Sequence, residues 1–189
     1  IEFQHIDQVI QFVNHPSKSS FSQLVAGLEI SCEENSIFIF NKQAVLPENQ
    51  WPQMHCANQK KLAIPGEVQL NEQWAICCRI VDLTPEIMET ALQNQDHYLA
   101  WLDLDQIHLP LTLRCRQPGD RFQPLGLSGK MQKLSDFMIN QKMPQRARSN
   151  WPLLVSSDEI LWVPGYQTAH HTRLTSQTKK ALFLQLERK

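Results

Sequence analysis

The apolar residues near the start of the chain recur at helical spacing. Ile6, Val9, Ile10 and Val13 occupy positions i, i+3, i+4 and i+7, and the pattern stops at residues 14–16, which are Asn, His and Pro. The sequence therefore predicts one short helix here. A stripe of this length is more typical of a packing surface than of a recognition element, and helices that pack on it would precede it in the chain.

After residue 20 the pattern changes to short alternating or β-branched runs separated by turn residues, which predict strands. These runs fall at residues 27–30, 36–40, 67–70, 74–81, 98–102, 111–115, 153–156 and 159–163, and an alternating apolar face follows at 182–186. Residues 41–63 contain two prolines and few periodic apolar positions, so we expect a loop there.

Two further helices are predicted among the strands. Thr84 is a helix-capping residue followed by Pro85 at the first helical position, and this helix should reach about residue 93. Another helix should begin near Leu134 and stop before Lys142. The sum is a β-rich α+β fold without the βαβ alternation of a nucleotide-binding sheet.

Composition narrows the class of protein. The chain has 189 residues, of which 42% are hydrophobic and 20% charged, as in ordinary globular proteins. No apolar run approaches the ~20 residues of a membrane-spanning helix, and the first residues do not resemble a secretory leader. The five cysteines are odd in number and lack zinc-type spacing, which disfavours a disulfide framework and fits a reducing cytoplasm. Because the first residue is Ile1 rather than Met, we expect a fragment of a longer protein.

Charge divides the chain into two unlike halves. Residues 1–113 hold 5 basic and 14 acidic side chains, whereas residues 114–189 hold 13 basic and 5 acidic ones. Residues 114–150 alone carry eight basic groups against Asp120 and Asp136. This block would bind a polyanion if the fold gathers it. It could also be a solvated surface or pair with the acidic half of the same chain, and charge alone does not decide.

Sequence motifs give no template for catalysis within this chain. There is no phosphate-binding loop of the Gly-x-x-x-x-Gly-Lys-Ser/Thr type, no Gly-x-Ser-x-Gly elbow and no His-Glu-x-x-His helix. Asp103 and Asp105 could do acid/base work, but a loop-capping role is favoured. His170 and His171 are adjacent and would point to opposite faces of a strand, which disfavours a shared metal ion. We therefore predict no catalytic and no metal-binding residue here.

The second half of the chain resembles a known family. The residues that carry the resemblance are LTLRCRQPGDRFQPLG at 111–126, KLSDF at 133–137, KMP at 142–144, Arg148, WPLL at 151–154 and WVPG at 162–165. In this order they are similar to the C-terminal domain of bacterial tRNA(Ile)-lysidine synthases. The resemblance implies a layered α+β domain like a module of the tRNA-synthetase β-subunit. It also implies that residues 1–18 end a helical connecting domain, that 19–110 form a β-rich segment and that 111–189 form the C-terminal domain. Whether 19–189 form one structural unit stays open.

The resemblance also implies a function. Members of the family use ATP, with Mg, and lysine to convert the wobble cytidine of the minor isoleucine tRNA to lysidine. Their catalytic N-terminal domain carries a Ser-Gly-Gly-x-Asp-Ser loop that this sequence lacks. Their C-terminal domain contacts the tRNA acceptor stem. We therefore expect a cytoplasmic, tRNA-binding part of a ligase without catalytic site or cofactor of its own, whose partners are this tRNA and the N-terminal catalytic domain. A homodimer stays open.

Specific residues follow from the basic block and the family motif together. The candidate RNA contacts are Arg114, Arg116, Arg121, Lys130, Lys133, Arg146 and Arg148. The candidate orienting or loop-shaping residues are Gly119, Asp120, Gly126, Gly129 and Asp136. Arg146 rests on charge and neighbourhood alone. Two other functions stay open: a module that docks on the catalytic domain without touching RNA, and an independent small-molecule enzyme, which ranks last because no catalytic constellation is present.

Overall fold

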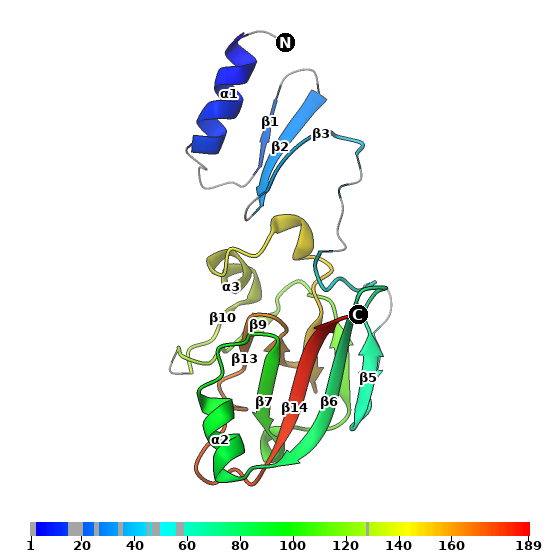
Figure 1. Cartoon of the computed structure of the whole chain (residues 1–189), viewed down its shortest axis with the longest axis vertical. Helices are drawn as coiled ribbons and strands as arrows, with labels where there is room; N and C mark the ends of the chain where they lie inside the picture. Colours follow the sequence, from blue (N-terminus) through cyan, green and yellow to red (C-terminus); the bar gives the residue numbers. More distant parts are fainter. Residues whose placement is uncertain are drawn as a thin grey trace. The chain divides into compact units, whose positions relative to one another are not determined.

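The computed structural model describes residues 3–14, 21–24, 27–33, 36–44, 46, 50–55, 59–127 and 129–189. The chain divides into two compact units (Figure 1). The smaller unit comprises residues 1–47 with 144–146, and the larger unit comprises residues 48–143 with 147–189.

The smaller unit holds one helix and one sheet. Its elements are α1 (Phe3–Asn14), β1 (Phe21–Gln23), β2 (Leu28–Glu33) and β3 (Ser36–Asn41). The strands are antiparallel in the order β1-β2-β3. The predicted helix and hairpin are confirmed, whereas β1 was not predicted. Phe12 is the buried residue of α1, and the predicted stripe residues Ile6 and Ile10 are exposed.

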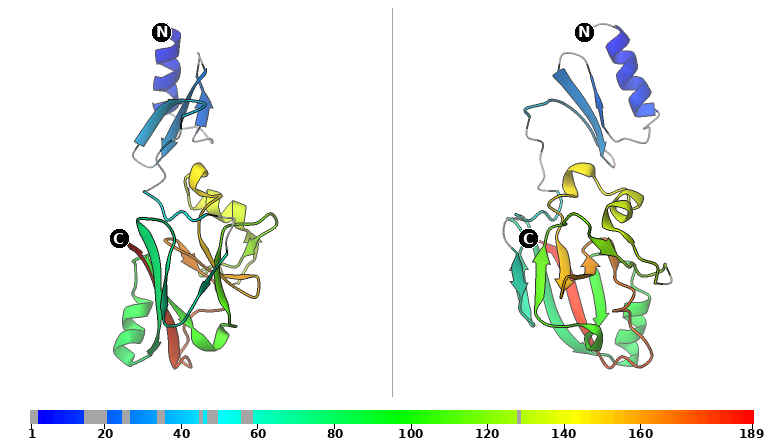
Figure 2. Two further views of the ribbon diagram at one scale, coloured as in Figure 1. Left: turned by 90° about the vertical axis from the view of Figure 1, so that its right-hand side faces the viewer. Right: turned by 180° about the vertical axis from the view of Figure 1, so that it is seen from behind.

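The larger unit is built on two antiparallel sheets (Figure 2). The five-stranded sheet has the order β13-β12-β11-β8-β4, from β13 (Gln167–Thr168), β12 (Glu159–Val163), β11 (Leu153–Ser156), β8 (Leu111–Arg114) and β4 (Lys60–Leu62). The four-stranded sheet has the order β5-β6-β14-β7, from β5 (Gly66–Gln69), β6 (Trp74–Asp82), β14 (Lys180–Arg188) and β7 (Leu99–Asp103). These assignments confirm the predicted strands of this unit.

The main hydrophobic core fills the space between these sheets. Leu182, Leu184 and Leu186 of β14 point into it from the four-stranded sheet, and Leu111 and Leu113 of β8 point into it from the five-stranded sheet. Their alternation along each strand is the periodicity seen in the sequence. The predicted helix α2 (Pro85–Leu92) follows β6 and lies outside the four-stranded sheet in the left view of Figure 2, and the Thr84 side chain caps it as expected.

A third layer covers the opposite face of the five-stranded sheet. It consists of α3 (Leu134–Asn140) and a hairpin of β9 (Arg121–Phe122) and β10 (Gln132–Lys133). Phe122 and Phe137 meet edge to face with ring centroids 5.0 Å apart in a second core, which also takes Val155 and Ile160 from the sheet. The short 3-10 turns are η2 (Leu104–Gln106) and η3 (Gln145–Ala147). The sheet-rich α+β class and its layered form are thus as predicted.

Two expectations about the organisation of the chain differ from the structure. Within the segment expected to be a loop, Lys60–Leu62 form β4 and pair with β8, and residues 51–54 are buried. The division expected at residue 110 falls inside the larger unit, because β14 pairs with β6 and β7 and because β8 pairs with β4. Long-range strand pairing of this kind leaves no mark in local sequence patterns.

The described helices include none that is long and apolar enough to cross a membrane. Cys77 and Cys78 are free thiols, whereas Cys115 takes part in a disulfide bond. The composition disfavoured a disulfide framework, but Cys115 is disulfide-bonded. Cys56 lies outside the described residues.

Candidate nucleic-acid interface

A tight turn links the end of β8 to β9. The Asp120 amide donates to the Gln117 carbonyl at 3.2 Å, with Pro118 and Gly119 at the two central positions. Gly119 has a φ of +87°, which is the geometry of the third residue of a type II turn and one that a side chain disfavours. The Pro-Gly-Asp sequence therefore specifies the turn, and it fixes where the next residue, Arg121, leaves it.

The turn is held by a two-pronged ion pair. The Arg114 guanidinium donates from Nη1 to Asp120 Oδ2 and from Nη2 to Asp120 Oδ1, both at 2.8 Å. Arg114 Nη1 also donates to the Cys115 carbonyl at 2.9 Å, and the Gln117 amide donates to Asp120 Oδ2 at 2.7 Å. The side chains of Arg114 and Asp120 are 5% and 12% exposed. Asp120 thus orients an arginine as proposed, but that arginine has little surface left to offer a phosphate.

Arg121 and Lys133 face each other across the β9–β10 hairpin. They are directly paired in the antiparallel register, and both are exposed, whereas Phe122 beside Arg121 is buried in the second core. Two like charges opposite each other on a strand pair are destabilising unless an anion neutralises them. No carboxylate of the described residues lies within 4.0 Å of either cation. We refer to Arg121 and Lys133 as the hairpin pair.

Arg116 and Arg148 form a second pair of cations. Burial, and next the positive charge of Arg116, lower the pKa of Arg148, so the two guanidinium groups interact. Arg148 is half-buried and donates from Nε to the Met143 carbonyl at 2.9 Å, whereas Arg116 is exposed. We refer to these two residues as the arginine pair. Arg116 lies two residues after Arg114 and Arg121 directly follows Asp120, so the buried ion pair connects both pairs of cations.

The long loop between β9 and β10 is fastened to the five-stranded sheet. The Leu125 amide donates to the Thr168 carbonyl at 2.9 Å, and the His170 amide donates to the Gln123 carbonyl at 2.8 Å. Gly126 and Gly129 both have positive φ values, of 93° and 77°. The exposed Lys130 follows them in the turn that its amide closes on Leu127. The glycines therefore shape this loop.

This loop does not have the geometry of a pyrophosphate-binding loop. Such loops place several backbone N–H groups at the start of a helix, where the helix dipole favours the anion. The segment from Gly126 to Lys130 leads instead into the two-residue strand β10. The residues of this segment thus do not fit an ATP site.

The remaining predicted residues have different surroundings. Arg146 is half-buried in η3. Asp136 lies exposed in the first turn of α3 and accepts a hydrogen bond from the Ser135 hydroxyl at 3.3 Å, and the described residues offer it no salt bridge. The salt bridge that we expected of both aspartates is therefore found at Asp120 and not at Asp136.

Asp103 caps a turn, as the sequence favoured. Its Oδ1 accepts from the Asp105 amide at 3.0 Å, and its Oδ2 accepts from the Thr178 hydroxyl at 2.6 Å. The side chain is 6% exposed. Both carboxylate oxygens are thus used to fix η2 and the start of β14, which leaves the acid/base alternative without support.

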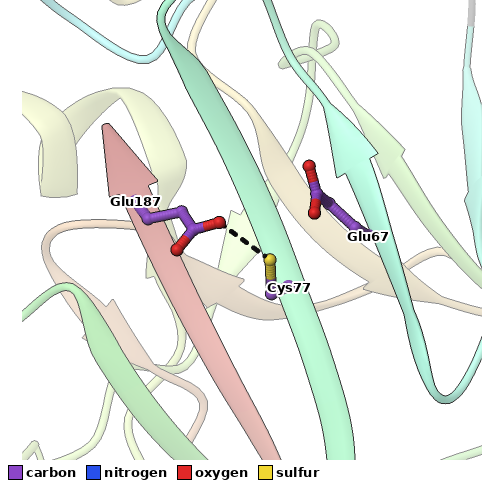
Figure 3. Close-up of side chains that lie close together, drawn as sticks. All are labelled: Glu67, Cys77 and Glu187. Carbon is purple, nitrogen blue, oxygen red and sulfur yellow. Dashed lines mark hydrogen bonds between the residues drawn. The ribbon is translucent and has the colours of Figure 1, made fainter. Parts of the chain in front are cut away.

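One cluster of possible metal ligands is found among the described residues, on the outer face of the four-stranded sheet (Figure 3). Ligand atoms of Glu67, Cys77 and Glu187 lie within 4.8 Å of one another. The Lys189 ammonium group lies 2.7 Å from Glu67 Oε1 and 3.3 Å from Glu187 Oε1, and the Cys77 thiol donates to Glu187 Oε1 at 3.1 Å. Burial, and next the hydrogen bond to Glu187, raise the pKa of Cys77 to about 12. A metal would need the thiolate, so the cluster is explained as an ion-paired network.

Sequence reasoning did not single out Gln123 or Glu159, and it considered His171 only as half of the histidine doublet; the fold brings all three close to Arg121. These residues are far apart in the sequence and belong to β12 and to the loops after β9 and β13. Lys142 adopts a positive φ of 53° at the end of α3 and was counted in the basic block without a specific role. No local pattern marks Gln123, Glu159 or Lys142 as functional.

The fold and these residues define a layered α+β domain that presents paired, unneutralised cations. The crystal structure of a TilS C-terminal domain aligns with a TM-score of 0.58 and 26% identity over 69% of this chain and 96% of that chain. An N-terminal fragment of the phenylalanyl-tRNA synthetase beta-subunit from Pyrococcus horikoshii aligns with a TM-score of 0.46 and 15% identity, over 97% of this chain and 63% of that one.

Sequence comparison finds related proteins. Residues 111–184 match the model of the TilS substrate C-terminal domain. The tRNA(Ile)-lysidine synthase of Dehalococcoides mccartyi is 29% identical over 188 residues, which cover 96% of this chain and 36% of that protein. That of Symbiobacterium thermophilum is 31% identical over 142 residues, 75% of this chain and 27% of that protein. This match over residues 111–184 confirms the resemblance seen in the sequence. The chain spans about a third of the length of the first curated relatives it matches.

Proposed function

We propose that this chain is the tRNA-binding portion of a cytoplasmic tRNA(Ile)-lysidine synthase, an ATP-dependent ligase that forms a C–N bond. In this proposal the chemistry, with ATP and Mg, belongs to a catalytic domain outside this chain, and the substrate is the minor isoleucine tRNA. The chain binds the acceptor stem of that tRNA and carries no catalytic residue. The relatives named above support the class of enzyme, and the cation pairs support the RNA contact.

The single observation that carries the RNA contact is the hairpin pair. Arg121 and Lys133 repel each other in the free protein, and a phosphate placed between them would convert that repulsion into two attractions. The guanidinium of Arg121 suits two-pronged contact with a phosphate, while Lys133 acts as a point charge. An A-form stem exposes phosphates and 2′-hydroxyls along its shallow minor groove, where such side chains can reach them.

The remaining cations extend this contact. The arginine pair and Lys130 add three positive charges, and the buried ion pair between Arg114 and Asp120 fixes the backbone between the two pairs. Arg114, which the sequence predicted to contact RNA, holds the turn in this proposal instead. Arg146 remains a prediction from the sequence. A cationic surface held by a rigid turn loses little conformational entropy when it binds.

The test is a filter-binding titration of the chain with the minor isoleucine tRNA and an unrelated tRNA at several salt concentrations. Contacts with about five phosphates give a slope of roughly −4 for log affinity against log salt. The variant Arg121→Ala should reduce that slope by about 1 and leave the melting temperature unchanged. Arg79→Ala is the matched control, because Arg79 is an exposed arginine of the four-stranded sheet.

The alternative function makes a different prediction for the same experiment. A module that docks on a catalytic domain through its cations would bind neither tRNA at low salt while remaining folded. Equal loss of affinity in Arg121→Ala and Arg79→Ala would show a diffuse charge effect and would contradict the role given to the hairpin pair.

A further inference from the structure

A cavity of about 380 Å³ lies beside Arg121 of the hairpin pair. The turn and strand at residues 118–123 form part of its wall, and the turn between β11 and β12 forms another part, with Asp158 and Glu159. Arg121 also lines it. A volume of this size falls in the range of sites that hold a molecule as large as one nucleotide.

The cavity contains a buried nitrogen atom that makes no hydrogen bond. His171 lines it, and its Nε2 atom is buried and has no hydrogen-bond partner among the described residues. Glu159 Oε2 lies 3.6 Å from this Nε2 atom, within ion-pair range for a protonated imidazole but beyond hydrogen-bond distance. Buried nitrogen atoms of this kind are nearly always paired in proteins. An imidazole nitrogen without a hydrogen bond on a cavity wall is therefore available to a ligand.

The charges around the cavity are of both signs. Arg121 offers donors, whereas Asp158 and Glu159 offer only acceptors when ionised. A phosphate alone would be repelled by the two carboxylates, and an apolar ligand would leave all of these groups unpaired. A ligand that fits both signs has a phosphate at one end and N–H donors at the other.

We infer that the cavity binds one unpaired nucleotide of the RNA, with its phosphate at Arg121 and an amino-bearing base against Glu159 and His171. This inference rests on the proposed function and adds a contact to a single base. Adenine, cytosine and guanine each present an exocyclic amino group, from which a carboxylate can accept a hydrogen bond. Uracil presents two carbonyl oxygens beside its one N–H group, and these oxygens are repelled by the carboxylate of Glu159.

The experiment uses the full chain and the four nucleoside 5′-monophosphates as probes. The imidazole resonance of His171, assigned with the variant His171→Gln, is followed by NMR during each titration. Amino-bearing nucleotides should shift this resonance with dissociation constants on the order of 1 mM. Uridine monophosphate should bind about tenfold more weakly, which is the cost of losing a hydrogen bond to a charged group.

Two substitutions decide whether Glu159 reads the base. Glu159→Gln should remove the preference over uridine monophosphate, because a glutamine amide can donate to a uracil carbonyl. Glu72→Gln is the matched control, an exposed glutamate in the turn before β6, and it should leave the preference unchanged. A preference that survives in Glu159→Gln overturns the inference, as does the absence of any shift at His171 with all four nucleotides.

A parallel tRNA titration separates this inference from the proposed function. Salt-sensitive tRNA binding without any nucleotide effect at His171 would overturn the cavity as a base site and leave the function standing. Binding of amino-bearing nucleotides that depends on Glu159, without tRNA binding at low salt, would support the cavity and count against the function.

Discussion

The substitution Arg114→Ala tests whether this arginine holds the turn or binds RNA. The variant removes both prongs of the ion pair with Asp120 and the hydrogen bond to the Cys115 carbonyl. Asp120 would keep one donor, the Gln117 amide at 2.7 Å, in a site where its side chain is 12% exposed. Breaking one side of such a buried pair costs about 3 to 5 kcal/mol, and the residual exposure of Asp120 favours the lower end.

This cost should be visible in thermal unfolding. For a unit of this size, about 3 kcal/mol lowers the melting temperature by roughly 10 °C. All five tryptophans belong to the larger unit, so their fluorescence reports on the unit that contains the ion pair. Arg114→Lys keeps the charge without the two-pronged geometry and should recover only part of the loss.

A double-mutant cycle isolates the pair. Asp120→Ala alone should also destabilise the unit, and the double variant should cost less than the sum by about 2 kcal/mol. At a temperature where each variant is folded, Arg114→Ala should change tRNA affinity far less than Arg121→Ala does. The reasoning is refuted if Arg114→Ala leaves stability within about 0.5 kcal/mol and weakens tRNA binding as strongly as Arg121→Ala, because the value expected for a surface residue is that small.

Local patterns predicted most elements of the larger unit, because each strand has one face in a core. The alternation of Leu182, Leu184 and Leu186 is visible since β14 lies between two other strands and fills the main core. Strand β4 was missed because it is a three-residue edge strand with two lysines, and Leu62 is its one buried residue. The two-residue strands β9, β10 and β13 are too short to show any period.

The sequence predicted the candidate site as a block of positive charge. It could not predict which of the basic side chains are buried in ion pairs and which are exposed. Arg114 and Arg121 are seven residues apart and look alike in the sequence. Arg114 is the last residue of β8, is buried and is held by Asp120. Arg121 is the first residue of β9 and is exposed opposite Lys133. Strand register and the type II turn decide which guanidinium is free, and both depend on pairings with distant parts of the chain. The cavity with Glu159 and His171 depends on the same pairings.

Two further predictions concern the core and the cysteine. Phe137→Ala should cost about 3 to 5 kcal/mol in urea unfolding, since the ring is 2% exposed and packs on Phe122, and a loss below about 1 kcal/mol would contradict its place in the second core. Cys77, studied with Cys78→Ala, should react with iodoacetamide at pH 8 at least about tenfold more slowly than an unperturbed thiol, because only the thiolate reacts. Since its pKa is raised to about 12, the rate should keep rising well above pH 9. Glu187→Gln removes the negative charge that favours the protonated thiol and leaves only a neutral amide oxygen as acceptor, so it should lower the pKa and speed the reaction at pH 9. An ordinary rate at pH 8 in the parent chain would show that Glu187 and burial do not hold the proton on Cys77, and it would reopen the cluster with Glu67 as a site for a thiolate-bound metal.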